Sequence, residues 1–187
     1  MKIPARYPLV ELMTGIFAVL VLYRYGLTPA AVYWFAFICV LITISFIDLD
    51  HQIIPDIISL PGIIVFASSF WFVPEMTIQK TITGILAGGG SLGLVALCYY
   101  LVRKQQGMGG GDIKLMAMIG AATGPKGVFF IIFAGSFIGT LSALGLMAHN
   151  KSFDISFKIP FGPFLSFGAV IYVFFGPDLI QWYFNMI

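Results

Sequence analysis

The sequence predicts an all-α, polytopic membrane helical bundle with about seven transmembrane helices, six being the alternative count. The composition indicates this, since 59% of the 187 residues are hydrophobic and only 10% are charged, and the mean hydropathy is +0.99. Soluble domains are typically about 45–50% apolar and about 25% charged. In addition, several separate apolar runs approach the roughly 20 residues that a helix needs to cross a bilayer.

Seven apolar runs are candidate spans, and none of them alternates with the period of two that a transmembrane β-barrel would show. The runs cover residues 8–25, 29–47, 57–73, 78–102, 113–123, 127–148 and 161–184. The fifth run is short because Gly124-Pro125 stops it. It therefore lies partly in the membrane interface, or else where protein neighbours thin the local membrane.

Two runs carry small residues four positions apart, Gly84 with Gly88 in the fourth and Gly135 with Gly139 in the sixth. This spacing lets helix backbones approach closely in a membrane, so we expect these glycines to serve packing. Cys39 and Cys98 lie singly inside spans, and we expect them to be apolar packing residues. The net charge of +2 gives no reason to expect a nucleic acid partner.

Basic residues predict the orientation, because short cytoplasmic loops are enriched in Lys and Arg. With the amino terminus in the cytoplasm, seven of the ten basic residues fall on that side, namely Lys2, Arg6, Arg103, Lys104, Lys114, Lys151 and Lys158. The carboxyl terminus then lies on the other side. No polar linker or repeat divides the chain, so we expect one domain over residues 1–187, and the sequence does not indicate its oligomeric state.

Acidic side chains beside apolar runs are costly and therefore mark candidate functional positions. Asp48, Asp50 and Asp56 follow one another at the cytoplasmic end of the second run. Pro55 disfavours helical backbone at the residue before it, so the chain should bend there. Asp48 then falls on the last turns of a helix, and Asp50, about 200° further around that helix, faces away from it.

Asp112 follows Gly109, Gly110 and Gly111 at the expected start of the fifth helix. An N-cap is one interpretation, since Asp suits that position. A phosphate-binding loop is a weaker one, because the Gly-Lys-Ser/Thr pattern is absent and an acid occupies the anion position. The glycines also leave room for a substrate backbone, so we take all three as candidate substrate-binding residues.

Asp48 and Asp112 are both expected at cytoplasmic helix ends, and together they predict an aspartyl peptidase. Such an enzyme needs one ionised carboxylate to take a proton from water and one protonated partner to polarise the scissile carbonyl. Asp48 lies at a helix carboxyl end and Asp112 at an amino end, so the helix dipoles predict a protonated Asp48 and an ionised Asp112. We therefore predict that these two residues are catalytic.

Two other functions remain open on the residues alone. A metal-dependent membrane transferase acting on lipid-linked phosphate could hold magnesium through Asp48, Asp50 and Asp56, with His51 beside them. A small proton-coupled transporter could use the same acids as proton relays.

The chain resembles a known family at these positions. Gly109-Gly-Gly-Asp112 fits the Gly-x-Gly-Asp signature of intramembrane aspartyl proteases, and Asp48 followed by Ile54-Pro-Asp56 fits the second-acid motif of type IV prepilin peptidases. The likeness extends to the segments 6–11, 107–115 and 159–164, in family order.

This resemblance implies a multi-pass enzyme of the bacterial inner membrane with its active site on the cytoplasmic side. It would remove the basic leader peptide from type IV prepilins or pseudopilins, for pilus assembly or type II secretion. Asp48 and Asp112 would be the catalytic acids, and the peptidase reaction would need no metal or other cofactor. The resemblance assigns no role to Lys114.

The family's second activity, methylation of the new amino terminus, would require S-adenosylmethionine, and no residue here marks its binding site. Full-length relatives begin with another span and a segment with two Cys-x-x-Cys pairs suited to structural zinc. Those cysteines are absent from this sequence, so zinc is not expected here. Glu11 would either contribute to a methyl-donor site or pair with a base such as Arg6, and we expect the pairing.

Overall fold

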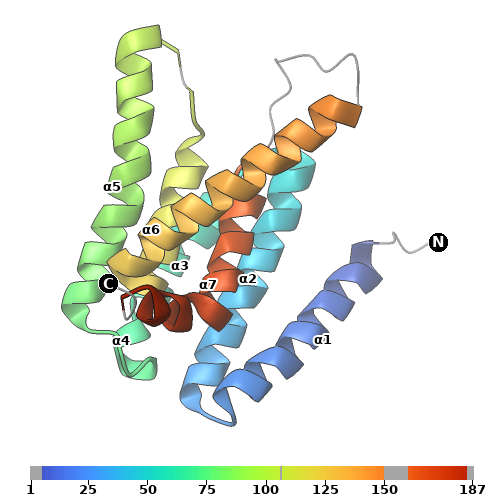
Figure 1. Ribbon diagram of the computed structural model, residues 1–187, viewed down its shortest axis with the longest axis vertical. Coiled ribbons are helices and arrows are strands. Elements are labelled where there is room, and N and C mark those ends of the chain that lie inside the picture. The colour runs from blue at the N-terminus through green and yellow to red at the C-terminus, as the bar shows by residue number, and fades with distance from the viewer. Residues whose placement is uncertain (1–5, 106, 150–159, 185–187) are drawn as a thin grey trace.

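A computed structural model describes residues 6–105, 107–149 and 160–184, and these residues form helices without strands. The helices are α1 (Arg6–Tyr25), α2 (Pro29–His51), α3 (Asp56–Phe66), α4 (Ser69–Phe72), α5 (Ile78–Arg103), α6 (Gly110–His149) and α7 (Gly162–Phe184). Within this part of the chain, five helices are long and apolar enough to cross a membrane, namely α1, α2, α5, α6 and α7. The predicted fold class is confirmed, and Figure 1 shows the helices as one bundle with α1 at its edge.

The predicted single span 57–73 is wrong, because the structure divides it into α3 and α4. At the break, the buried Tyr33 hydroxyl donates to the Phe66 carbonyl at 2.8 Å, and the Ser68 hydroxyl donates to the Val65 carbonyl at 2.6 Å. These side chains take carbonyls that a continuing helix would use. At 1.5 Å per residue the 11-residue α3 is about 16 Å long, too short to cross the membrane alone.

The predicted break at Gly124-Pro125 is confirmed inside α6. Gly124 has φ 70° and ψ 179°, a conformation open essentially only to glycine. Figure 1 shows the two parts of α6, coloured yellow and orange, running in different directions from this turn. The first part is buried almost throughout from Leu115 to Thr123. Protein neighbours therefore surround the short fifth span, as in the second of the two alternatives.

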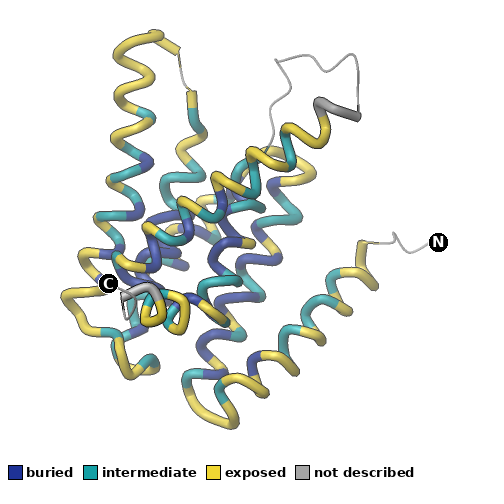
Figure 2. The backbone as a smooth tube through the Cα atoms, viewed as in Figure 1, coloured by how far each residue is buried: buried dark blue, intermediate teal, exposed yellow. Residues whose placement is uncertain are grey.

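Small residues bring α5 directly against the first part of α6. A Cβ atom on Gly84 would collide with the Gly120 carbonyl oxygen, and one on Gly88 with the Met116 carbonyl oxygen. In the second part of α6, a Cβ on Gly135 would lie 3.1 Å from a backbone carbonyl oxygen of α7. The predicted packing role of these glycines is confirmed. Figure 2 shows the buried residues gathered in the middle of the bundle, whereas α1 and the carboxyl end of α5 are largely exposed.

Replacing Gly84 by Val should lower the free energy of unfolding by about 1–3 kcal/mol, the usual cost of overpacking. The new side chain has no space, because backbone atoms of Gly120 and Gly124 occupy it. Gly90→Val is the matched control in the same helix, since nothing lies within 4 Å of a Cβ there. Thermal unfolding in detergent compares them, and equal stability of the two variants would contradict this packing.

Candidate active site

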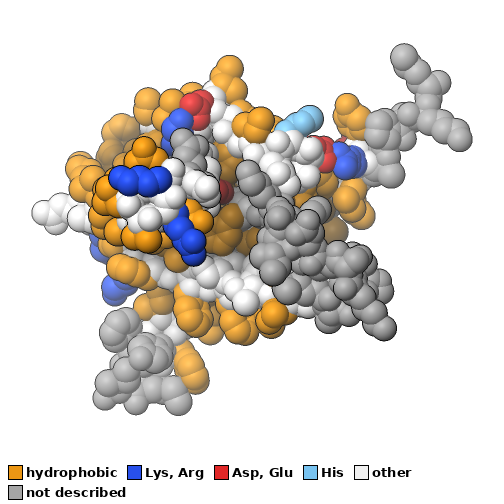
Figure 3. All heavy atoms as spheres, turned by 90° about the horizontal axis from the view of Figure 1, so that it is seen from above, with side chains coloured by type: hydrophobic (Ala, Val, Ile, Leu, Met, Phe, Trp, Pro, Cys, Tyr) orange, Lys and Arg blue, Asp and Glu red, His pale blue; other side chains and the backbone are white. Residues whose placement is uncertain are grey.

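Four helix ends meet at the end of the bundle that faces the viewer in Figure 3. They are the carboxyl end of α2 and the amino ends of α3, α6 and α7, and contacts between them are described below. Figure 3 shows acidic side chains beside basic ones at the rim of this end and a further acidic patch recessed between them. The predicted meeting of the Asp48 and Asp112 segments at one end is therefore present. Lys2 and the loop 151–158 lie outside the described residues.

Asp48 is buried, with 5% of its surface exposed, on the same face of α2 as the core residues Ile44 and Leu41. Its Oδ2 atom accepts a hydrogen bond from the Gly162 N–H at the start of α7, at 3.1 Å. The helix ends three residues later at His51, and the next residue, Gln52, takes a left-handed φ of 53° while its N–H donates to the Asp48 carbonyl at 2.8 Å. Asp48 thus lies on the last turns of the helix, as predicted.

Asp112 is partly buried in the first turn of α6. The predicted N-cap is wrong, because α6 already begins at Gly110 and the Asp112 N–H donates to the Gly109 carbonyl at 3.2 Å. The helix thus begins two residues before the acid. Asp112 nevertheless stays in the first turn of α6, near the positive end of the helix dipole.

Ile54 connects the surroundings of the two acids. It belongs to the non-helical connection 52–55 between α2 and α3, and it is 6% exposed. A Cβ on Gly111, next to Asp112, would lie 2.8 Å from the Ile54 Cβ. A Cβ on Gly162, which binds Asp48, would lie 3.2 Å from the Ile54 Cδ1. Both glycines therefore make room for Ile54, which contacts the neighbour of Asp112 on one side and the residue that binds Asp48 on the other.

The three glycines before Asp112 have different surroundings. The space beside Gly111 is filled by Ile54, whereas nothing lies within 4 Å of the position a Cβ would take on Gly110. A Cβ on Gly109 would be 3.5 Å from Asp112 Oδ2. Gly109 and Gly110 thus leave open space near the acid, while Gly111 is needed for packing. Their role in substrate binding stays a prediction.

The other acids of the first motif bind basic side chains. Asp50 forms an ion pair with Arg6, so it faces away from Asp48 as predicted, and Arg6 does not take the Glu11 partner we expected. Asp56 forms an ion pair with Lys114 at 2.6 Å.

Asp48, Asp50 and Asp56 therefore have three different partners and do not converge as magnesium ligands would. Among the described residues, no three His, Cys, Asp or Glu side chains are grouped to hold a metal ion. This arrangement does not fit the magnesium site of the transferase hypothesis.

Sequence reasoning missed two features of the site. Gly162 lay in a segment that resembles the family, but its contact with Asp48 joins residues 114 positions apart, and only its place at a helix start hinted at a free N–H donor. Lys114 could be located but not interpreted, because its partner lies on another helix.

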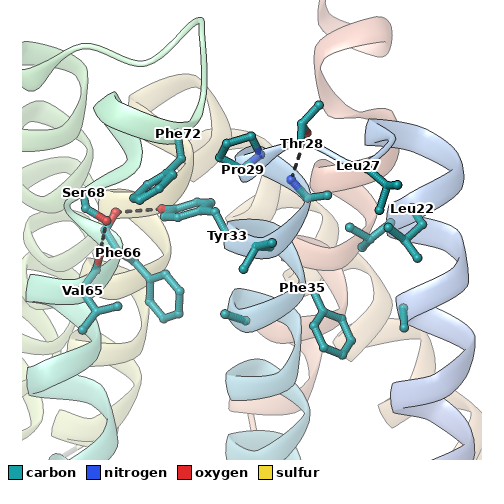
Figure 4. A pocket seen from close by; sticks show the side chains of 15 residues that line it. Leu22, Leu27, Thr28, Pro29, Tyr33, Phe35, Val65, Phe66, Ser68 and Phe72 are labelled. Atoms are coloured by element: carbon teal, nitrogen blue, oxygen red, sulfur yellow. Dashed lines mark hydrogen bonds between the residues drawn. The ribbon is translucent and has the colours of Figure 1, made fainter.

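An apolar hollow of about 870 Å³ lies away from the acids, between α1, α2 and the α3–α4 segment. Figure 4 shows Thr28 and Pro29 at the start of α2, and Tyr33, Phe66 and Phe72 further around the hollow. No carboxylate or histidine lines it. Despite its size it therefore offers no group for acid–base chemistry, and the site with the two acids is the better candidate for a reaction.

Two carboxylates at helix ends of the same part of the bundle, one of them held by a backbone N–H, can perform acid–base hydrolysis. One acid can bind and deprotonate water while the other donates a proton to the substrate oxygen. Open space lies beside Gly110, two residues before Asp112.

Comparison with known proteins finds similarity over most of the chain. The type IV leader peptidase family matches residues 35–144. A prepilin leader peptidase/N-methyltransferase of Neisseria gonorrhoeae is 37% identical, over 88% of this chain and 56% of the relative. Proteins of the same name from Xanthomonas campestris and Aeromonas salmonicida are 34% and 33% identical, over 97% and 99% of this chain and 63% of each relative. The chain thus spans less than two thirds of these relatives, and no solved structure matches it.

Proposed function

Because the chain belongs to the type IV leader peptidase family, we propose that it is a peptidase that removes the leader peptide of a type IV prepilin or pseudopilin, with Asp48 and Asp112 as its catalytic acids. The observation that supports the proposal is that the segments carrying these two acids, the end of α2 and the start of α6, both lie against the Ile54 connection. The names of the relatives support the substrate class. The enzyme would serve pilus assembly or type II secretion.

The reaction is a hydrolysis by water held between the two carboxyl groups. The ionised carboxylate removes a proton from water as its oxygen attacks the scissile carbonyl carbon, and the protonated partner donates its proton to the carbonyl oxygen. Collapse of the tetrahedral intermediate breaks the C–N bond and passes a proton to the leaving amine. The Gly162 N–H holds one oxygen of Asp48, so the carboxyl group keeps its direction during these transfers.

The position of the acids suits a substrate that is itself anchored in the membrane. Both lie at helix ends of a multi-pass membrane protein, so the scissile bond would be cut at the membrane edge. The bias of Lys and Arg supports the cytoplasmic side of the inner membrane as that edge.

The test is to incubate the purified protein with a prepilin in detergent and to measure the product mass. The proposal expects loss of the leader, also in the presence of a chelator, whereas a metal-dependent transferase would lose its activity. A parallel reaction with S-adenosylmethionine shows whether a methyl group is added to the new amino terminus. An intact prepilin after prolonged incubation, or substrate flux in sealed vesicles without cleavage, would overturn the peptidase assignment.

A further inference from the structure

The Lys114–Asp56 ion pair joins α6 to α3 close in sequence to Asp112, and it has no role in the reaction described above. The Lys114 Nζ donates to both carboxylate oxygens of Asp56, at 2.7 and 2.6 Å. Lys114 is two residues after Asp112 on α6, and Asp56 is two residues after Ile54 at the first position of α3. The pair therefore joins the segment that carries one acid to the connection that follows the other.

The connection 52–55 is not helical, so contacts with its neighbours hold it in place. Its first residue is tied to α2 through the Gln52 N–H and the Asp48 carbonyl. Its other end continues into α3, where Asp56 binds Lys114. Between these ties, Ile54 lies against Gly111 and near Gly162. A shift of α6 relative to α3 would therefore move Asp112 and loosen the packing of Ile54 beside Asp48.

We infer that Lys114 and Asp56 are positioning residues, whose ion pair holds the amino end of α6 against the Ile54 connection and so keeps Asp112 in register with Asp48. This inference rests on the proposed function for its effect on activity, but its structural part stands without it. The side chains of the pair are 37% and 58% exposed, so its contribution is that of a surface pair, which is modest. Small displacements of catalytic groups nevertheless cost rate steeply.

A second ion pair provides the matched control. Arg24 at the end of α1 binds Asp178 in α7 at 2.6 Å, and the two side chains are 42% and 62% exposed. It resembles the Lys114–Asp56 pair in N···O distance and in side-chain exposure. Asp178 lies in the later part of α7, whereas Asp48 is bound by the amino end of that helix. Its removal should leave the site unchanged.

The structural test is disulfide formation between Ile54→Cys and Gly111→Cys in a background with Cys39→Ala and Cys98→Ala. The two Cβ atoms would lie about 2.8 Å apart, closer than the roughly 3.5–4.5 Å of a disulfide, so the two segments must separate slightly before the bond forms. Because the ion pair controls this separation, Lys114→Gln or Asp56→Asn should change the cross-linking rate roughly three- to tenfold. Lys114→Arg, and the exchange of charges in Asp56→Lys/Lys114→Asp, should restore most of the rate, and Arg24→Gln should not change it.

The kinetic test uses the same substitutions, apart from the introduced cysteines, with a prepilin substrate. Lys114→Gln should lower kcat roughly three- to tenfold with little change in KM, and Lys114→Arg should retain it. Unchanged cross-linking and kcat in both single variants would overturn the inference. So would a charge exchange that fails to restore cross-linking, since each residue would then act alone. If the unaltered protein cleaves no prepilin, the proposed function fails, and the cross-linking result still decides on the ion pair.

Discussion

Asp48→Asn and Asp112→Asn should each reduce the rate of prepilin cleavage by about 10²–10⁴-fold, the usual contribution of general acid–base catalysis. An amide can neither take the proton from water nor donate one as a carboxylic acid does. The fold should persist, because Asn has nearly the same shape and its carbonyl oxygen can still accept the Gly162 N–H. The measurement is the single-turnover rate of leader removal by each purified variant.

Glu75→Gln is the control for these variants, since it makes the same chemical change at an exposed carboxylate in the turn before α5. It should cleave at the rate of the unaltered protein. Cleavage at that rate by either aspartate variant would contradict the assignment of that residue.

Gly162→Ala should reduce the cleavage rate by roughly 10²-fold, the effect of displacing a catalytic group by about 1 Å. A Cβ on residue 162 would lie 2.6 Å from Asp48 Oδ2 and 3.2 Å from Ile54 Cδ1. The Asp48 carboxyl group must move away, which also disturbs its hydrogen bond with the residue 162 N–H. The steady-state parameters should show the loss mainly in kcat.

Gly15→Ala is the comparison for this variant, because nothing lies within 4 Å of a Cβ there. Its cleavage rate should be unchanged. If Gly162→Ala were as active as Gly15→Ala, the contact of Asp48 with the start of α7 would have no importance for the reaction.

Hydropathy predicted most of the fold because the membrane requires long apolar helices, and each predicted run corresponds to helical segments. The turn at Gly124 was predictable, since Gly-Pro is a local signal. The break between α3 and α4 was not predictable. The Tyr33 hydroxyl that binds the Phe66 carbonyl at this break lies 33 residues away in the sequence, so no local pattern announces the contact.

For the candidate site, the sequence predicted which helix ends carry the acids but not the contacts between those ends. Asp48 and Asp112 could be paired because each acid stood beside an apolar run at the same expected face. The N-cap interpretation of Asp112 was wrong, because α6 already begins at Gly110. Gly111 was interpreted as space for substrate, but its neighbour Ile54 reaches it from another connection. Contacts of this kind join distant segments and leave no periodic signal in the sequence.

The binding of a prepilin peptide with a hydroxyethylene group in place of the scissile bond tests most directly whether Asp48 and Asp112 act together. Its hydroxyl resembles the tetrahedral intermediate, and a peptide with a methylene group at that atom is the control. The unaltered protein should bind the hydroxyl peptide at least about 10²-fold more tightly than the control, and Asp48→Asn and Asp112→Asn should each abolish this preference. Equal binding of the two peptides by the unaltered protein, or a preference that survives in either variant, would contradict a catalytic pair at this site.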